Sequence, residues 1–588
     1  MKKSTRLKFF ILSLILLSFF PSPQSVAQGF LKANGKYITN QKGEKVILRG
    51  VGLGGWMLQE GYMLRVRNIG QQQHVIKGKI EELIGTEKTA EFYDRWQQNH
   101  MRKIDVDSMA AWGFNSIRLP MHYNLFTLPV EKEPVEGKNT WIEKGFAMTD
   151  SLLSWCESNK IYLILDLHAA PGGQGNDVNI SDRDESKPSL WESEANRKKT
   201  IALWEKLAER YKNNPWIGGY DIINEPNWGF VNGEHRNGCD EKTNAPLKEF
   251  LMEATAAIRK IDNNHIIIIE GNCWGNNYEG MFPLWDSNMV ISFHKYWNKN
   301  EVESIQKFID IREKYNVPVW LGESGENSDV WFRDAIRLVE SHEIGWAWWP
   351  LKKLGFNNPL EVKVNSGYQK ILDFWAGNGT KPTSDEASSA LMELADNLKL
   401  ENCIYHKEVI DAMFRQVKSD LTVPFKNNSV SENSVINAAD FDLGRQGFAY
   451  FDNDEADYHI STGTDWVSWN KGRVYRNDGV DIERDNMNGY FVNHFETNEW
   501  LQYTVSIEKS GNYTIELSVA SNNSDGKISL KVNQNESYQT AQIPNSNGEQ
   551  NWQTIVIENV KLEHGTSIMK FHADNGGFSF KSFKFIEE

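Results

Sequence analysis

Between residues 45 and 351, short apolar runs recur, each followed by a polar or glycine-rich loop and then by a longer segment with helical spacing of its apolar residues. Continuous apolar runs of this length are typical of strands that are buried on both faces, and such strands form parallel sheets when helices separate them. Eight runs fit the pattern, at residues 45–55, 114–122, 162–169, 217–226, 265–271, 289–296, 317–324 and 344–351. Eight strand–helix units predict an α/β fold, a closed (β/α)8 TIM barrel.

An open doubly wound sheet is the alternative that the same alternation allows. That fold carries a glycine-rich phosphate loop after its first strand, and no loop with the dinucleotide spacing follows residues 45–55. We therefore expect the barrel over residues 28–420, where two further helical segments after the last strand complete its outer layer.

The pattern changes after residue 420. Residues 421–434 combine a proline with a polar tract, which is typical of a linker. Over residues 435–588, apolar and polar residues alternate in short runs separated by Asn, Asp and Gly. This alternation predicts an antiparallel, all-β sandwich as a second domain.

The N-terminus has the pattern of a secretory signal peptide over residues 1–27. Four basic residues precede an apolar run from Phe9 to Phe20, and small residues follow as far as Ala27. An uncleaved anchor is the alternative, but the run is shorter than the roughly 20 residues that cross a bilayer. We expect cleavage near Ala27 and a secreted or periplasmic protein with no stable membrane anchor.

Composition narrows the function further. The 588 residues carry a formal net charge of −15, which argues against a nucleic-acid partner. The 22 Trp, 19 Tyr and 29 Phe supply many flat rings for core packing or for stacking on a ligand. Four cysteines lie far apart and form no metal pattern, at Cys156, Cys239, Cys273 and Cys403. One or two disulfides stay open, and we expect buried free thiols.

Polar residues at the carboxyl ends of the predicted strands are the candidates for chemistry, because these ends all meet at one mouth of a barrel. They are Arg118, His168, Asn224, Glu225, His294, Tyr296, Glu323 and Trp349. Trp348 should point elsewhere, since side chains alternate along a strand. Asp166, Asp221 and Glu270 also lie on strands, and we expect them to pair beneath the site, with Glu270 near enough to reach the cleft.

Two of these residues suit the cleavage of a glycosidic bond. The reaction needs one carboxylic acid to protonate the departing oxygen and another carboxylate on the opposite face of the sugar. Glu225 and Glu323 fit the two places. Arg118 should hold Glu323 ionised through charge-assisted hydrogen bonds, and Tyr296 is placed to bond the same carboxylate.

The fragments around these residues resemble glycoside hydrolase family 5 and follow its order: SIRLP at 116–120, DLHAAPG at 166–172, NEP at 224–226, FHKY at 293–296 and LGESG at 321–325. The resemblance covers residues 30–380, and LRGVGLGGWMLQE at 48–60 is most similar to the branch that contains exo-β-1,3-glucanases. It implies Glu225 as acid/base, Glu323 as nucleophile, retention of the anomeric configuration, and no metal or other cofactor for catalysis.

The same resemblance implies which residues bind the sugar. Asn224 would bond its 2-hydroxyl, and His168 and His294 would orient hydroxyls or the two carboxylates. Trp349 would offer a ring face as the floor of the subsite where cleavage occurs. Glu60 matches a sugar-binding position of the exo-acting branch.

β-1,3-Glucan is the favoured substrate, while β-1,6- and β-1,4-glucans, β-mannans, and exo or endo action stay open. A catalytically inactive barrel that only binds polysaccharide is a second hypothesis, against which the presence of both Glu225 and Glu323 argues. A third is a metal-dependent hydrolase with His168 and His294 as ligands. The sequence has no third histidine at ligand spacing beside these two, which argues against it.

The C-terminal domain resembles carbohydrate-binding modules of family 6, through NAADFDLGRQGFAYFDNDEAD, NGYFVNHFETNEWLQYTV, SGNYTIELSVAS and NWQTI. The resemblance implies that Tyr490 and Trp552 form an aromatic pair that sandwiches a sugar. The predicted partner of the whole protein is therefore a polysaccharide or oligosaccharide, and its oligomeric state stays open.

This domain also departs from the family at two places. The resemblance implies a structural calcium ion, but Asn437 and Ala439 replace the paired Glu that open the family's domain, which argues against that ion. The family's sugar-binding Asn near the last strand is replaced by Ser579 or Lys581.

Overall fold

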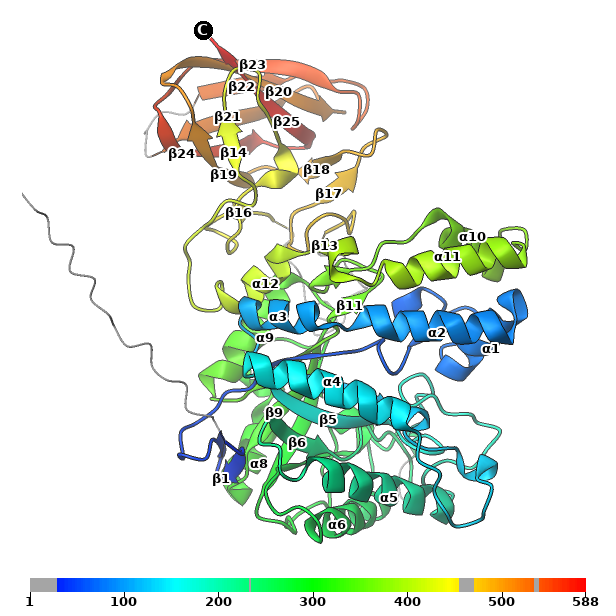
Figure 1. Cartoon of the computed structure of the whole chain (residues 1–588). Coiled ribbons are helices and arrows are strands. Elements are labelled where there is room, and N and C mark those ends of the chain that lie inside the picture. The colour runs from blue at the N-terminus through cyan, green and yellow to red at the C-terminus, as the bar shows by residue number, and fades with distance from the viewer. Residues whose placement is uncertain (1–28, 232–233, 454–469, 534–538) are drawn as a thin grey trace, which may run out of the picture.

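The computed structural model describes residues 29–231, 234–453, 470–533 and 539–588, so the predicted signal peptide, residues 1–27, lies outside the described residues. Its first unit is a closed barrel of parallel strands in the order β10-β3-β4-β5-β6-β7-β8-β9 (Figure 1), which confirms the predicted fold. The strands are β3 (Arg49–Gly52), β4 (Ser116–His122), β5 (Tyr162–Ala169), β6 (Ile217–Asp221), β7 (Ile267–Glu270), β8 (Met289–Lys295), β9 (Val319–Gly325) and β10 (Trp346–Trp349).

Alternation along the barrel strands separates two sets of side chains. On β5, Leu163, Leu165 and Leu167 belong to the large core shared with the surrounding helices. Tyr162 and Ile164, with the opposite parity, join a smaller core that other strands also supply. Asp166 and His168 continue this second set toward the carboxyl end of β5. Because successive side chains point to opposite faces, the polar residues at the strand ends turn into the barrel mouth.

Helices cover the barrel, and an additional helical layer lies beside it. The helices are α1 (Gln73–Ile84), α2 (Thr86–His100), α3 (Lys103–Trp112), α4 (Glu143–Asn159), α5 (Glu194–Tyr211), α6 (Ala245–Arg259), α7 (Asn272–Gly275), α8 (Gln306–Tyr315), α9 (Asp329–Ser341), α10 (Ser366–Trp375), α11 (Ser384–Asp396) and α12 (Lys407–Phe414). α1, α2, α10 and α11 pack together (Figure 1). Ile80, Trp96 and Leu391 belong to the apolar core of this layer.

The two helical segments that the sequence predicted after the last barrel strand correspond to α11 and α12, and they lie in different layers. α12 packs on α9 and completes the barrel's outer layer as predicted, whereas α11 packs on α2 and α10 in the additional layer. Thr383 and Glu386 form a capping box at the start of α11, so this helix begins at a clear local signal.

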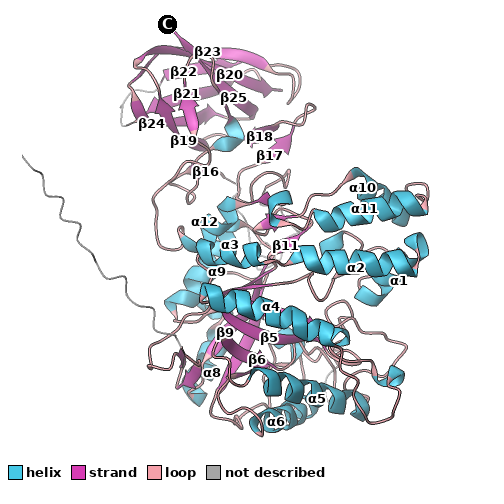
Figure 2. Ribbon diagram, viewed as in Figure 1, coloured by secondary structure: helices cyan, strands magenta, loops and turns pink. Residues whose placement is uncertain are grey.

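The second unit is a sandwich of two antiparallel-rich sheets, drawn in magenta at one end of the molecule in Figure 2. One sheet contains β14 (Asn428–Val430), β19 (Trp500–Ile507), β24 (Gly565–Asn575), β21 (Gly526–Val532) and β22 (Gln539–Ile543), with β16 (Tyr450–Phe451) on β19. The other contains β17 (Ile482–Arg484), β18 (Tyr490–Phe495), β25 (Phe578–Glu587), β20 (Gly511–Ser521) and β23 (Gln553–Leu562), with β15 (Val435–Asn437) on β25. Phe571, Phe580 and Phe583 lie in the core between the sheets.

The segment predicted as a linker, residues 421–434, is partly built into the sandwich. β14 lies inside this segment and pairs in parallel with β19, and Val423 bridges Leu443. A polar, proline-containing stretch therefore supplies an edge strand here, a position that tolerates such a composition.

Small elements complete the fold. The short strands are β1 (Lys32–Asn34), β2 (Tyr37–Thr39), β11 (Lys352–Lys353), β12 (Leu360–Glu361) and β13 (Ile404–Tyr405). The 3-10 helices are η1 (Gly61–Leu64), η2 (Tyr123–Leu125), η3 (Val130–Lys132), η4 (Val302–Ser304), η5 (Leu400–Asn402) and η6 (Ala438–Asp440). Among the described residues, no helix combines the length and the apolar character that a membrane crossing requires.

Candidate active site

A cavity of about 660 Å³ opens at the mouth of the barrel, where the strands end. Seven of the residues predicted for the site line it: Glu60, His168, Glu225, His294, Tyr296, Glu323 and Trp349. Residues that were not predicted for the site complete its wall, namely Tyr62, Asp177, Asn179, Ile180, Trp274, Asn276, Lys295, Trp297, Asn298, Lys307 and Glu326. The predicted residues therefore converge on one pocket, and the rim comes from loops.

The two predicted carboxylates face each other across this pocket. Glu225 follows β6, and Glu323 lies on β9. One oxygen of each carboxylate lies within 4.8 Å of the other, and both residues are 6% exposed. Glu225 has a φ of 43°, a left-handed conformation that a glutamate rarely adopts. Such a conformation persists only where the surrounding structure holds it, as at a functional site.

Hydrogen bonds hold both the side chain and the backbone of Glu225. Its Oε1 lies 2.6 Å from His294 Nδ1, and its backbone N–H donates to Glu270 Oε2 at 2.7 Å. Burial raises the pKa of Glu225 to about 7; the charges of Glu323 and Glu270 add to the rise, and His294 opposes it. A carboxyl group with this pKa holds its proton at mildly acidic pH and can release it during a reaction near neutrality.

Glu323 is held as an acceptor of two strong hydrogen bonds. Arg118 Nη1 donates to its Oε2 at 2.8 Å, and the Tyr296 hydroxyl donates to its Oε1 at 2.5 Å. Both contacts were predicted. Hydrogen bonds and positive charge stabilise a carboxylate anion, so Glu323 is set up to react as an anion rather than as an acid.

Arg118 is the centre of a fully buried polar layer beneath the pocket. Besides Glu323, it contacts Asp166 at 3.3 Å, Asp221 at 2.9 Å and Glu270 at 2.8 Å. Burial alone would lower the pKa of Arg118, but the surrounding carboxylates outweigh it and raise this pKa well above its ordinary value. The predicted pairing of Asp166, Asp221 and Glu270 beneath the site is thus what the structure contains.

The carboxyl groups of this layer differ in how readily they ionise. Burial would raise the pKa of Glu270, but His294 and Arg118 hold it at about 2. Burial and the neighbouring Glu270 raise the pKa of Asp221 well above its usual range. His294 is buried, which lowers its pKa, yet Glu270, Glu323 and Glu225 together raise it well above that of a free imidazole. The layer therefore carries ionised Glu270 beside protonated His294.

His168, Trp349 and Asn224 form a second chain of contacts. The His168 ring stacks on Trp349 with centroids 5.1 Å apart and planes at 4°, and its Nδ1 lies 2.7 Å from Asp166 Oδ2. The Asn224 amide donates to His168 Nε2 at 3.2 Å, and its Oδ1 accepts from Arg118 at 2.8 Å. Asn224 is fully buried below the residues that line the cavity. Its contact with a sugar 2-hydroxyl stays a prediction.

Trp349 and its neighbour Trp348 point to opposite sides of β10, as predicted. Trp349 lines the pocket and its indole N–H donates to the Tyr62 hydroxyl at 2.8 Å. Trp348 packs with Phe332 and Trp346 in the outer core. Only the first of these rings can form a floor for a ligand.

Glu60 lies in the pocket wall, on the segment that precedes η1. The Asn179 amide donates to its carboxylate at 3.3 Å. Burial raises the pKa of Glu60 well above its usual range, and the charges of Glu323, Glu326 and Glu225 add to the rise. This shift favours the protonated form of Glu60, which can both donate and accept a hydrogen bond.

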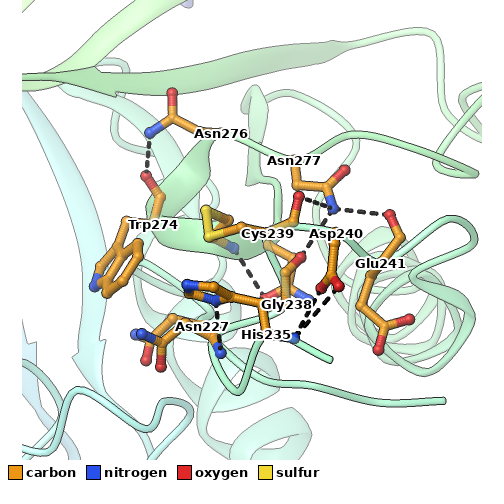
Figure 3. Close-up of a disulfide and its surroundings, with 12 residues drawn as sticks. Asn227, His235, Gly238, Cys239, Asp240, Glu241, Trp274, Asn276 and Asn277 are labelled. Atoms are coloured by element: carbon orange, nitrogen blue, oxygen red, sulfur yellow. Dashed lines mark hydrogen bonds between the residues drawn. A yellow bond between two sulfur atoms is a disulfide. The ribbon is translucent and has the colours of Figure 1, made fainter. Parts of the chain in front are cut away.

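A disulfide supports one side of the rim, which corrects the expectation of four free thiols. Cys239 and Cys273 are bonded, 34 residues apart in sequence, while Cys156 and Cys403 remain thiols. Figure 3 shows the bond between the loop after β6 and the segment after β7, next to Trp274. Two cysteines on different loops have no local spacing signal, so the pairing was not predictable.

Trp274 is held at the rim by its neighbours. Its indole N–H donates to Asp177 Oδ2 at 3.3 Å, and its carbonyl accepts from the Asn276 amide at 2.9 Å (Figure 3). Its φ of 55° is left-handed, as is that of Cys273 beside it. The disulfide thus fixes the strained turn that aims an indole ring at the cavity.

The hypothesis of a histidine metal site fits this geometry poorly. Glu225, His294 and Glu323 bring ligand atoms within 4.8 Å of one another, but His168 is not one of this group. His168 uses Nδ1 on Asp166 and Nε2 on Asn224, and His294 uses Nδ1 on Glu225. The two histidines orient carboxylates and an amide.

In the C-terminal unit, the structure does not bring the predicted aromatic pair to one face. Tyr490 stacks on Tyr475 with centroids 4.3 Å apart, whereas Trp552 packs edge-on against Phe491 at 5.2 Å. Tyr490 and Phe491 are successive residues of β18 and point to opposite faces of the sheet. The prediction of a Tyr490–Trp552 sandwich is therefore wrong in its pairing, and Trp552 lies with Phe491 instead.

The other two departures from the family also have structural partners. Asn437 accepts a hydrogen bond from the Ala439 backbone at 2.8 Å, and Ala439 has no side-chain ligand atom, so these two positions offer no carboxylate to a calcium ion. The Ser579 hydroxyl donates to Asn493 at 2.8 Å, and Lys581 pairs with Asp485 at 2.7 Å. Each side chain is used within the module.

A closed barrel with paired carboxylates over a pocket, joined to a β-sandwich, is the architecture of a modular polysaccharide-degrading enzyme. Residues 74–355 match the family model for cellulase (glycosyl hydrolase family 5), and residues 473–587 match the model for carbohydrate binding module (family 6). The barrel therefore contains a glycoside hydrolase family 5 domain over residues 74–355, and the sandwich contains a family 6 module over residues 473–587.

Curated relatives agree with this assignment. The chain is similar to "Beta-xylosidase" of Phanerodontia chrysosporium, at 26% identity over 59% of this chain and 76% of that protein. It is similar to "Endoglucanase C" of Acetivibrio thermocellus, at 24% identity over 43% of this chain and 84% of that protein. It also resembles "Probable glucan 1,3-beta-glucosidase A" of Aspergillus niger, at 24% identity over 42% of this chain and 55% of that protein. These relatives carry different substrate names.

Proposed function

We propose that the protein is a secreted, retaining β-glycosidase that hydrolyses β-glucan, with β-1,3-glucan as the favoured substrate. The observation that carries this proposal is the pair formed by Glu225 and Glu323, whose carboxylate oxygens lie within 4.8 Å of each other. Retaining enzymes place their carboxyl groups about 5–5.5 Å apart, whereas inverting enzymes leave room for a water molecule between them. The spacing supports direct attack by one carboxylate on the sugar.

In the first step, a Glu323 oxygen attacks the anomeric carbon and the glycosidic C–O bond breaks. Glu225 gives its proton to the departing oxygen, so the leaving group departs as a neutral alcohol. Arg118 and Tyr296 hold Glu323 in position, Arg118 through Oε2 and Tyr296 through Oε1. The product is a glycosyl ester on Glu323 and an ionised Glu225.

In the second step, Glu225 takes a proton from water and the resulting hydroxide attacks the same carbon from the opposite side. The ester bond to Glu323 breaks, and both side chains return to their starting states. The charge of Glu323 contributes to the raised pKa of Glu225. Ester formation removes that charge, so the pKa of Glu225 falls when it must act as a base.

The pocket wall supports recognition of a single sugar ring at the cleavage point. Trp349 presents a ring face, and His168 and Glu60 present polar groups at the same cavity. Apolar ring faces stack on the C–H faces of sugars while polar groups bond their hydroxyls. Glu60 and Trp274 line the same cavity, and their position supports action on a chain end.

The substrate assignment rests on similarity and on the opening segment at residues 48–60. The glucan 1,3-beta-glucosidase relative supports β-1,3-glucan. An endo-acting β-1,4-glucanase is the second candidate, because "Endoglucanase C" is matched over 84% of its own length. The carbohydrate-binding module and the N-terminal pattern of residues 1–27 support export to the place where polysaccharides are found.

A substrate panel tests the proposal. The enzyme is incubated with laminarin, pustulan, carboxymethyl-cellulose, mannan and xylan, and the products are resolved by chain length and by anomer with NMR. We expect glucose of β-configuration as the first product from laminarin. An α-anomer as the first product would exclude the retaining mechanism, and no hydrolysis of an aryl β-glucoside or any polysaccharide would favour an inactive binding barrel.

A further inference from the structure

The loop that joins β9 to α9 forms part of the active-site wall. It begins directly after the strand that carries Glu323, and its residue Glu326 lines the cavity. Glu326 has a φ of 53°, and its carboxylate pairs with Lys353 at 2.5 Å. A glutamate keeps a left-handed conformation only where its neighbours fix the backbone. The structure must therefore hold the residues that follow Glu326.

The C-terminal module supplies that support through one residue, Asn477. Asn477, in the segment between β16 and β17, is fully buried against the loop. Its side-chain amide donates to the Asn327 backbone carbonyl at 3.1 Å and to Asp329 Oδ1 at 2.8 Å. Its backbone carbonyl accepts from the Asp329 backbone N–H at 2.8 Å. Figure 1 shows the module seated on the side of the barrel that carries α12. Three hydrogen bonds thus connect the module to residues 327–329.

The same loop also contacts the catalytic residues. The Asn327 amide donates to the Tyr296 carbonyl at 3.2 Å. The Tyr296 hydroxyl donates to Glu323 at 2.5 Å. The path from Asn477 to the nucleophile therefore runs through two residues, Asn327 and Tyr296, each hydrogen-bonded to the next.

We propose that the C-terminal module is a structural part of the active site, and that Asn477 is a positioning residue for Tyr296 and for the pocket wall at Glu326. This inference rests on the proposed role of Glu323 as nucleophile. The module then acts on every substrate, including one too small to reach a glycan-binding face. A module that only recruits polysaccharide would change the hydrolysis of polymers and leave small substrates unaffected.

The test uses the full chain and an aryl β-glucoside, which occupies the pocket alone. Asn477→Ala removes the two amide contacts, and the isosteric Asn477→Asp replaces the donor while preserving the shape. Gln502→Ala is the matched control, because Gln502 is a buried amide of the module that bonds Thr422 and Asp442. We expect both Asn477 variants to lose about tenfold in kcat, a size typical of small displacements of catalytic groups, while Gln502→Ala stays within about twofold.

A double-variant cycle identifies the contact. Asp329→Ala removes the acceptor of the Asn477 amide, so Asn477→Ala combined with Asp329→Ala should lose no more kcat than the worse single variant. Losses that multiply would overturn the proposed contact. Unchanged kcat in both Asn477 variants would overturn the positioning role.

Hydrogen exchange measures the local stability of the loop after β9 without any substrate. We expect faster amide exchange over residues 325–331 in Asn477→Ala than in the parent and in Gln502→Ala. If the parent hydrolyses no glycoside, the proposed function fails while this measurement still tests the contact. Equal exchange in all three proteins would contradict the inference whatever the activity.

Discussion

The barrel and the β-sandwich differ in how their sites follow from the order of residues. In the barrel, Arg118, His168, Glu225, His294 and Glu323 come from different strands and still meet at one cavity or directly beneath it. In the sandwich, the predicted pair of aromatic residues lies on opposite faces of one sheet. The carboxyl ends of all barrel strands meet at one mouth, so knowing that a polar residue ends a strand is enough to place it at the site. In an antiparallel sheet, a shift of one residue changes the face, so the register decides the site.

The largest effect expected on the barrel side is the loss of either carboxyl group. Glu323→Gln and Glu225→Gln should each lower kcat by about 10³-fold or more on an aryl glucoside with a poor leaving group. With dinitrophenyl β-glucoside, whose leaving group needs no proton, Glu225→Gln should keep much more of its first-step rate and Glu323→Gln should not. The exposed Glu253→Gln on α6 is the control. Equal losses on both substrates would contradict the separate roles.

The pH profile sharpens the account of Glu225. Its pKa of about 7 means that the proton donor is present below this pH and absent above it. We expect kcat/KM to fall about tenfold for each pH unit above 7, as a single deprotonation requires. His294 lowers this pKa, so His294→Gln should move the alkaline limb to higher pH. A limb that moves to lower pH would contradict the assigned interaction.

Removing the disulfide tests whether the rim loops contribute to substrate binding separately from the residues at the strand ends. Cys239→Ser with Cys273→Ser should raise KM for oligosaccharides several-fold and leave kcat within about twofold, because the rim holds substrate while Glu323 lies on β9 and Glu225 follows β6. Dithiothreitol should reproduce the effect in the parent protein and have none in the double variant. The buried thiol Cys156 serves as the control site, with Cys156→Ala. A large fall in kcat would show that the rim also positions the catalytic groups.

The smallest expected effect concerns the outer face of the module. If Trp552 contributes to glycan binding, Trp552→Ala should weaken binding to insoluble β-glucan several-fold, a loss of about 1 kcal/mol for one stacked ring. Tyr490→Leu, which removes the flat ring but keeps an apolar side chain, should bind like the parent, because Tyr490 packs on Tyr475 within the module. Binding that is lost in the Tyr490 variant and kept in the Trp552 variant would restore the original assignment of the cleft to Tyr490.

The sequence was sufficient for the barrel floor because periodicity and strand ends are local signals. Strand β5 was placed at its observed bounds, and the pairing of Arg118 with Glu323 followed from charge alone. The rim was not predictable in the same way. Trp274 depends on a left-handed turn and on a disulfide between two loops. Glu326 depends on a loop held by Asn477, about 150 residues further along the chain.

The short connection between the two units has a consequence for where a polysaccharide is cut. α12 ends at Phe414 and β14 begins at Asn428, so residues 415–427 alone separate them, and Val423 within this stretch is already bridged to Leu443. The barrel and the sandwich are therefore joined by a short connection rather than by a long linker. A glycan bound by the sandwich would lie at one set distance from the barrel mouth, and hydrolysis would be confined to glycosidic bonds within that distance.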